Sequence, residues 1–374
     1  WMTGFIVGSA IGPLVGGALL EFFWWGSVFL LGVPVMALLL VCGPLLLPEF
    51  RDEQAGRQDF LSALLSVAMV IAVIYGLKDM ARNGVSWAPL LSIAAGLVIG
   101  MLFVRRQRRL AEPMFDLALF RNRTFSTSVV AMLLTVLALS GAWLMVFQYL
   151  QGVLGLSPLH AGLVMLPPAV IQTIVSLLVP RLTRYMSRGV LVSVGLLLSV
   201  FGFLSMAMVT GMDNMAWLVA GMVIMGVGVM PMMILGTDMV VSAAPPNKTG
   251  AASATSETAT ELGMALGIAV IGSAGAAVYR AHMAGVLPPD LPADLALAAG
   301  DTLGGALDAA SQLPPDVSDL VLSGAREGFT QALHTNALIG AAIVAITAIM
   351  VGWLLARRQA IPAAPNDTTQ TETP

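Results

Sequence analysis

Charged residues and cysteine are scarce in this sequence. Asp, Glu, Lys and Arg make up 10% of its 374 residues, whereas a soluble domain has about 25%. The only cysteine is Cys42, which excludes a disulfide within the chain. The formal net charge of −3 gives no indication of a nucleic-acid partner. A chain with so little charge lacks the polar surface of a soluble protein, so we expect a membrane protein.

Sequence patterns of common enzymes and metal sites are absent as well. No Cys/His cluster has the spacing of a metal site, and neither Gly-x-Ser-x-Gly nor His-Glu-x-x-His occurs. Lys and Arg are also missing from the interior of the apolar segments described below, where an anion carrier should have one. We therefore expect a protein that is not an enzyme, holds no metal or organic cofactor, and favours cations over anions.

Long apolar runs take the place of these motifs. Hydrophobic residues make up 57% of the chain, and runs of about 20 residues are long enough to cross a bilayer as helices. The sequence predicts an all-α integral membrane protein with ten spanning segments. These are residues 2–20, 26–47, 60–78, 87–104, 125–148, 160–179, 189–210, 215–238, 250–278 and 332–355.

The distribution of basic residues predicts the orientation. If the first segment starts in the cytoplasm, 14 of the 18 Lys and Arg lie in inner loops, as the positive-inside rule requires. The outer loops then hold only Lys78, Arg82, Arg280 and Arg326. This topology places the C-terminus in the cytoplasm, where the Pro- and Thr-rich tail, residues 359–374, is expected to be disordered.

The outer loop between the last two segments, residues 279–331, is long and acidic. Its middle, residues 291–310, is rich in Ala and Leu and can form short helices. Its carboxylates either concentrate cations at the outer mouth or belong to a solvated spacer. Both interpretations remain open.

Two acids lie well inside the ninth segment. Glu257 and Glu261 are four residues apart, which places them on one helix face about 6 Å from each other. Ser253, Ser256 and Thr260 extend this into a polar stripe. Two carboxylates in a poorly solvated place repel each other, so they favour binding of a proton or of an organic cation. The pair therefore predicts a proton-coupling and cation-binding site. The alternative is a hydrogen bond to a neighbouring helix.

A third acid, Asp238, lies at the inner end of the eighth segment. It is a weaker candidate for proton coupling, because a charge at a segment end is cheap and can reach the membrane interface. Beyond the acids, Gly263 and Gly267 have the small-xxx-small spacing that lets two helices approach closely.

Four further side chains are candidates for lining a substrate cavity. Trp143, Phe147 and Gln148 lie on the fifth segment, and Gln172 lies on the sixth, after Pro167-Pro168, which should break or bend that helix. Aromatic faces attract organic cations. The alternative for each of them is contact with lipid or packing in the core.

The first segment carries a motif with a family resemblance. The string from Gly8 through Gly12, Pro13 and Gly16 to Gly17 resembles the antiporter signature in the fifth helix of major facilitator superfamily drug exporters. Residues 112–125 are similar to the link into the second six-helix half of the fourteen-helix drug:proton antiporter family. The basic loop 180–189 resembles a repeated inner-loop motif in degenerate form. The acid pair resembles that of the quaternary-ammonium and methyl-viologen exporters in this family.

The resemblance implies a major facilitator fold with ten of fourteen helices present. Residues 1–47 would be the end of the first six-helix half, 48–124 two extra central helices with linkers, and 125–358 the second half. The chain begins directly in an apolar run without a signal peptide, so we expect four more helices before it.

The implied function is proton-coupled export of lipophilic cationic drugs by a monomer in the lipid of the bacterial inner membrane. Protons are the coupling ion. A carrier for another solute, an inactive fragment and a non-transporting membrane protein are the alternatives.

Overall fold

The computed structural model describes residues 2–46, 59–84, 86–110, 113, 115–210 and 215–354. Within these ranges the chain is helical and contains no strand. Nine helical stretches of the described residues are long and apolar enough to cross a membrane. They correspond to the second through tenth expected segments, and the first is a helix over Met2–Phe22 with a shorter apolar stretch, Ile11–Phe22. The predicted all-α membrane architecture is confirmed.

The helices follow the chain in a simple order. They are α1 (Met2–Phe22), α2 (Ser27–Leu30), α3 (Gly32–Leu46), α4 (Phe60–Asn83), α5 (Trp87–Gln107), α6 (Arg123–Gln148), α7 (Pro158–Val164), α8 (Leu166–Leu182), α9 (Arg188–Met206), α10 (Met215–Ser242), α11 (Thr249–Val286), α12 (Ala293–Asp301), α13 (Leu303–Ala310) and α14 (Pro315–Leu354). Two 3-10 turns, Leu119–Arg121 and Pro246–Lys248, and a π-helical turn, Tyr149–Val153, lie between them.

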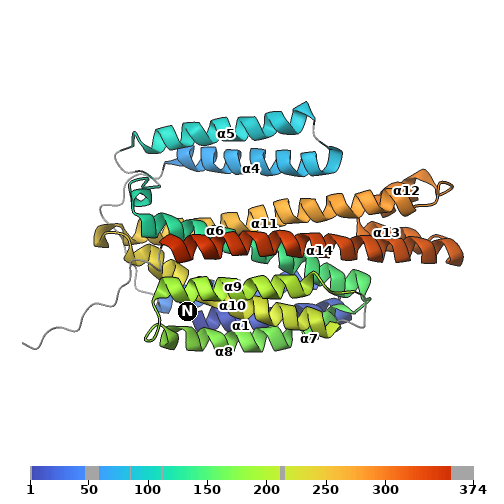
Figure 1. Ribbon diagram of the computed structural model, residues 1–374, viewed down its shortest axis with the longest axis horizontal. Helices are drawn as coiled ribbons and strands as arrows, with labels where there is room; N and C mark the ends of the chain where they lie inside the picture. The colour runs from blue at the N-terminus through green and yellow to red at the C-terminus, as the bar shows by residue number, and fades with distance from the viewer. Residues whose placement is uncertain are drawn as a thin grey trace, which may run out of the picture.

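The core is a bundle formed by α6, α9, α10, α11 and α14 (Figure 1). Small residues bring its helices together. A Cβ atom on Gly221 of α10 would lie 2.9 Å from the carbonyl oxygen of Gly202 on α9. Met222, Met225 and Met232 of α10 are buried in this core, where their flexible side chains fill the space between helices.

The approach of α11 to α6 confirms the prediction from Gly263 and Gly267. A Cβ atom on Gly263 would lie 2.6 Å from the carbonyl oxygen of Leu133, and one on Gly267 would overlap the carbonyl oxygen of Leu137. Real Cβ atoms do not approach other atoms this closely. Glycine at these two positions therefore sets the distance between the two helices.

The break predicted at Pro167-Pro168 is also confirmed. One helix, α7, ends at Val164, and the next, α8, begins at Leu166, with the two prolines in its first turn. Proline has no backbone N–H group. It is tolerated in the first turn of a helix, because the N–H groups of that turn have no acceptor within the helix. The sixth expected segment is thus two helices that meet at the buried Met165.

The end of the molecule that the sequence assigns to the outside is more helical than expected. The short helices predicted within residues 291–310 are present as α12 and α13. In addition, α11 continues to Val286 and α14 already begins at Pro315. These extensions pack on each other, since a Cβ atom on Gly324 would lie 2.6 Å from the Val286 side chain. Both helices therefore extend beyond the apolar segments that cross the membrane, because their extensions are stabilised by packing on each other.

The pair formed by α4 and α5 lies beside the bundle (Figure 1). Their inner ends are joined by Arg106, which donates two hydrogen bonds of 2.9 Å to Asp59. Gln107 donates to the Ser62 hydroxyl at 2.7 Å and accepts from the backbone nitrogen of Phe115 at 3.0 Å. This network connects the helix pair to the linker that precedes α6.

The linker is in turn attached to the turn before α11. Lys248 of that turn forms an ion pair with Asp116, and Asn122 donates to the carbonyl oxygen of Ala243 at 2.9 Å. The expected linker residues 48–58, Glu112 and Met114 of the linker motif, and the tail 359–374 lie outside the described residues.

Candidate functional site

Both glutamates of the predicted proton site lie on the unbroken helix α11. Glu257 and Glu261 are exposed, on a side of the helix different from the one that Gly263 and Gly267 present to α6. Their common face, predicted from the spacing, is confirmed. The described residues leave both carboxylates uncovered, and the poor solvation of the site stays a prediction.

One of the three hydroxyl residues predicted to extend the acid pair into a polar stripe is buried. Ser256 is fully buried and donates to the carbonyl oxygen of Ser253 at 2.9 Å. Thr260 donates to the carbonyl oxygen of Ser256 at 3.1 Å. Both hydroxyls are satisfied by the backbone of their own helix, which is a common arrangement for Ser and Thr in helices. Ser256 is therefore not part of the exposed stripe, whereas Ser253 and Thr260 are partly exposed.

Neither glutamate is neutralised within the described part of the chain. No residue there forms a hydrogen bond or ion pair with Glu257 or Glu261, so the alternative of a bond to a neighbouring helix is not observed in these ranges. The pair thus offers two negative charges on one face of α11. This arrangement can bind protons or a cation, which compete for the same oxygens.

Asp238 is in a different environment. Its Oδ2 atom lies 2.9 Å from Nη1 of Arg188, the first residue of α9, and both side chains are substantially exposed. The pair links the inner end of α10 to the start of α9. No hydrogen bond or ion pair among the described residues joins Asp238 to the acid pair.

The four cavity candidates are only partly brought together. The rings of Trp143 and Phe147 are stacked, with centroids 5.9 Å apart and planes inclined by 28°, and both pack against the core. Gln148 is exposed and lines a pocket. Gln172 instead lies against α10, where its amide occupies the space that a side chain on Gly226 would fill.

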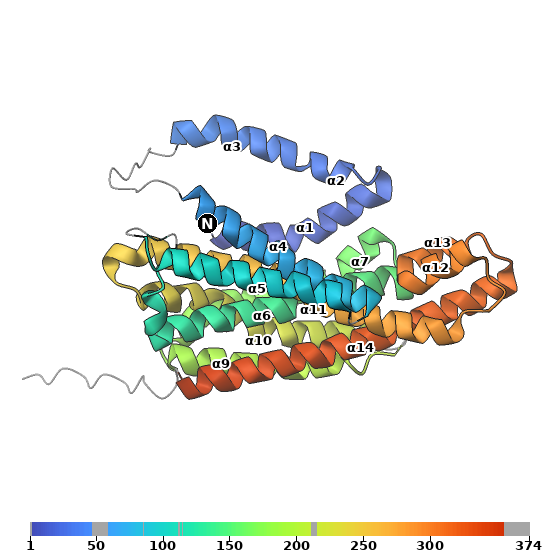
Figure 2. The same ribbon diagram turned by 90° about the horizontal axis from the view of Figure 1, so that it is seen from above.

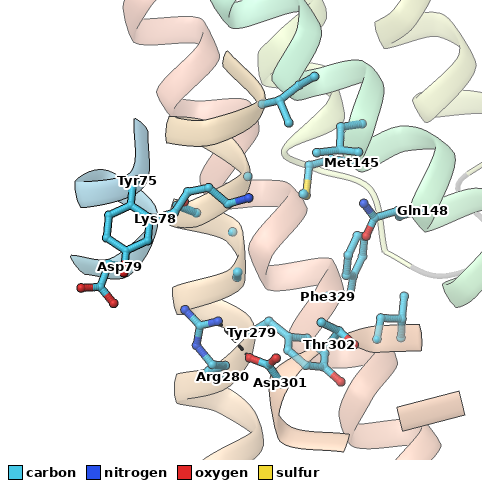
Figure 3. A pocket seen from close by; sticks show the side chains of 17 residues that line it. Tyr75, Lys78, Asp79, Met145, Gln148, Tyr279, Arg280, Asp301, Thr302 and Phe329 are labelled. Atoms are coloured by element: carbon cyan, nitrogen blue, oxygen red, sulfur yellow. Dashed lines mark hydrogen bonds and ion pairs between the residues drawn. The ribbon is translucent and has the colours of Figure 1, made fainter. Parts of the chain in front are cut away.

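The pocket lined by Gln148 lies where α11 meets α12, at the end of the bundle that the sequence assigns to the outside (Figure 3). Its cavity volume is about 820 Å³. We call it the outer pocket and define it by the residues labelled in Figure 3. These are Tyr75, Lys78 and Asp79 of α4; Met145 and Gln148 of α6; Tyr279 and Arg280 of α11; Asp301 of α12 with the following Thr302; and Phe329 of α14.

Two polar contacts hold α12 against this pocket. Arg280 Nη1 lies 3.3 Å from Asp301 Oδ1, and the Tyr279 hydroxyl donates to the carbonyl oxygen of Ala299 at 2.9 Å. Sequence reasoning missed the outer pocket, because it assigned Lys78 and Arg280 to outer loops. A signal in the sequence could have indicated the pocket. Lys78 and Arg280 each lie within one helical turn of the end of an apolar segment, so each can belong to the same helix as that segment.

The antiporter-like string makes a close contact at one end. A Cβ atom on Gly17 of α1 would lie 2.6 Å from the carbonyl oxygen of Pro158 in α7, and one on Gly162 of α7 would lie 2.8 Å from that of Pro13. The ridge formed by the other glycines of the string has open space around it in the described structure. Those glycines are Gly8, Gly12 and Gly16.

Comparison with known proteins gives a consistent family assignment. Residues 1–268 match the family model described as Major Facilitator Superfamily. The multidrug efflux pump LfrA of Mycolicibacterium smegmatis is 40% identical over 94% of this chain and 69% of its own length. The methyl viologen resistance protein SmvA of Salmonella typhimurium is 34% identical over 94% of this chain and 71% of its own length. The tetracenomycin C resistance and export protein of Streptomyces glaucescens is 33% identical over 75% of this chain and 52% of its own length.

Proposed function

The chain belongs to the Major Facilitator Superfamily, and from this membership we propose that it exports lipophilic organic cations across the bacterial inner membrane in exchange for protons. The relatives support the substrate class by their names, which describe a multidrug efflux pump and a methyl viologen resistance protein. Methyl viologen is itself a flat organic cation. The proposal for this chain is of the same chemical class.

The observation that carries the proposal is the acid pair of α11. Glu257 and Glu261 lie one turn apart on an exposed face, and no described residue neutralises them. Two negative charges at this distance repel each other in the membrane interior, where charges are weakly screened. Protons or an organic cation relieve that repulsion. Two protons neutralise the pair, and a cation added to the doubly protonated pair would leave an excess of positive charge, so the cation has to displace a proton.

This competition is sufficient for exchange. A cation that enters from the inside displaces protons from the carboxylates, and the cation leaves when protons return from the outside. Alternating access of the family fold would connect the pair to one side at a time. A monomer suffices for the proposal, because both carboxylates belong to one helix.

The proposed orientation places the C-terminus in the cytoplasm. It is supported by the positive-inside rule and by the contacts at one end of the molecule. The pairs Asp59–Arg106, Asp116–Lys248 and Arg188–Asp238 join segments that the sequence assigns to the inner side. These contacts are expected if all of these segments lie on one side of the membrane, and the positive-inside rule makes that side the cytoplasm.

Transport in inverted membrane vesicles tests the proposal. Tetraphenylphosphonium, a lipophilic monocation, should accumulate in vesicles that contain the protein when the vesicle interior is acidified. We expect Glu257→Gln and Glu261→Gln each to reduce the initial rate by at least about tenfold, which corresponds to about 1.4 kcal/mol. Glu21→Gln, a change at an exposed glutamate near the end of α1, is the matched control and should transport like the parent. Parent-like transport by both α11 variants would exclude the acid pair as the coupling site.

A further inference from the structure

The outer pocket lies along the same face of α11 as the acid pair. Ile268, Gly272 and Tyr279 line it and follow Glu261 by 7, 11 and 18 residues. With 3.6 residues per turn, these spacings return to nearly the same side of the helix. Ile268 is therefore about 10 Å farther out than Glu261 at 1.5 Å per residue. A ligand that leaves the acid pair outward along this face reaches the outer pocket.

The size and walls of the pocket suit an organic molecule. Its volume of about 820 Å³ falls within the range of about 300–1,000 Å³ that is usual for small-molecule sites. Phe329 and Met145 form a buried apolar wall, and Tyr75, with 63% of its surface exposed, stands on the opposite side (Figure 3). Aromatic faces of this kind attract organic cations.

The charges of the pocket favour weak binding of a cation. Lys78 and Arg280 balance Asp79 and Asp301, so these four side chains carry no net charge, whereas the acid pair carries two negative charges when ionised. Arg280 lies 3.3 Å from Asp301. A cation that approaches Asp301 therefore also meets the guanidinium of Arg280, which repels it. A cation is therefore attracted less strongly by the outer pocket than by the acid pair. Release to the outside requires such a decrease.

We propose that the outer pocket is a second binding site, which holds an amphipathic organic monocation between the acid pair and release to the outside. This inference rests on the proposed function, because it assumes that such cations reach α11. It adds a low-affinity site formed by α4, α6, α11, α12 and α14, and thereby gives α4 a direct part in substrate binding.

Cysteine labelling with ligand protection tests this site. The single native cysteine is replaced first, as Cys42→Ser. Ser273→Cys then places a thiol in the pocket wall, and Val270→Cys places one on an exposed part of α11 outside the pocket. Both are labelled with a small methanethiosulfonate reagent, with and without tetraphenylphosphonium. At ten times its dissociation constant the ligand leaves about one tenth of the sites empty, so labelling at position 273 should slow about tenfold. Labelling at position 270 should not change.

Two further variants separate the outer pocket from the acid pair. Protection at position 273 should persist in the Glu257→Gln/Glu261→Gln background, because the pocket binds the cation without these carboxylates. It should weaken severalfold in Tyr75→Leu, which removes an aromatic face. Protection that disappears with the acid pair, or that is unaffected by Tyr75→Leu, overturns the second site.

The outcomes also distinguish this inference from the proposed function. Export of tetraphenylphosphonium without protection at position 273 overturns the outer site and leaves the proposed function standing. Absence of both export and protection overturns the two together. Protection at positions 270 and 273 alike would show a general change in the accessibility of α11, and this would contradict binding in the pocket.

Discussion

Six acidic side chains of this structure form two groups that differ in their partners. Asp59, Asp116, Asp238 and Asp301 each contact a basic side chain. Glu257 and Glu261 have no such partner among the described residues. The first group joins segments at the inner and outer ends of the bundle, where a charge is cheap to hold. The second lies within a long apolar helix, where an unpaired charge is costly and points to function.

The best-connected member of the first group is Asp59, which makes a prediction about pH. Two hydrogen bonds from Arg106, together with the Ser62 hydroxyl, hold the pKa of Asp59 well below its ordinary value. A carboxyl with a lowered folded-state pKa stabilises the fold above its unfolded pKa of about 4, and this contribution is lost as the pH falls from there towards the folded value.

We therefore expect Asp59→Asn to lower the melting temperature of the purified protein by a constant amount between pH 8 and pH 5. Below about pH 4 the difference between parent and variant should shrink. Thermal unfolding in detergent, measured across this pH range, gives the comparison. A difference that grows on acidification would mean that Asp59 has no stabilising partner in solution.

At the scale of elements, the contact between α1 and α7 depends on two glycines. Gly17 faces the backbone of Pro158, and Gly162 faces that of Pro13. The antiporter-like string is thus a packing surface at its outer part, where backbone meets backbone. The string itself contains a control, because a Cβ atom on Gly12 would have nothing within 4 Å in the described structure.

Gly17→Ala should force α1 and α7 apart, because its Cβ atom would lie 2.6 Å from a backbone oxygen that cannot rotate away. Overpacking of this kind costs about 1–3 kcal/mol of unfolding free energy. Gly12→Ala should leave stability unchanged or raise it slightly, since alanine favours helix. Thermal unfolding of the two variants side by side measures the difference, and equal stabilities would contradict the contact.

Most elements could be predicted from the sequence because hydropathy determines where a helix can cross a membrane. The break before Pro167-Pro168 and the approach at Gly263 and Gly267 were also predictable, since the residue types themselves impose them. The outer ends of α11 and α14 were not. Outside the membrane these helices continue because they pack on each other, and such pairing leaves little trace in hydropathy.

The same limit applies to the glycine string. Its spacing indicates that a neighbouring helix can approach closely, but Gly8, Gly12 and Gly16 make no such contact in the described structure. The structure places the contact at Gly17 instead. Small residues permit an approach on any side of a helix, and the choice of side depends on a partner, α7, that lies far away in the sequence.

At the scale of the whole molecule, α11 connects the inner contacts to the outer end (Figure 2). It begins next to Lys248, carries the acid pair, and ends beside α12 at the outer pocket. The acid pair could be predicted because it lies in one segment. The outer pocket could not, because five helices, α4, α6, α11, α12 and α14, converge to form it.

The acid pair and the outer pocket lie at different points along α11. In this account, exchange of a cation for protons depends on the acid pair. The outer pocket has balanced charge and cannot couple a cation to protons by itself. If Glu257 and Glu261 exchange protons for a cation, proton release should therefore depend on them and on no other glutamate exposed along the bundle.

Proton release from the purified protein measures this dependence most directly. Tetraphenylphosphonium is added to the protein in weakly buffered detergent solution, and the pH change is followed with an indicator. The account predicts release from the parent and from Glu21→Gln, and none from Glu257→Gln/Glu261→Gln. Equal release from the parent and from the double variant would contradict it.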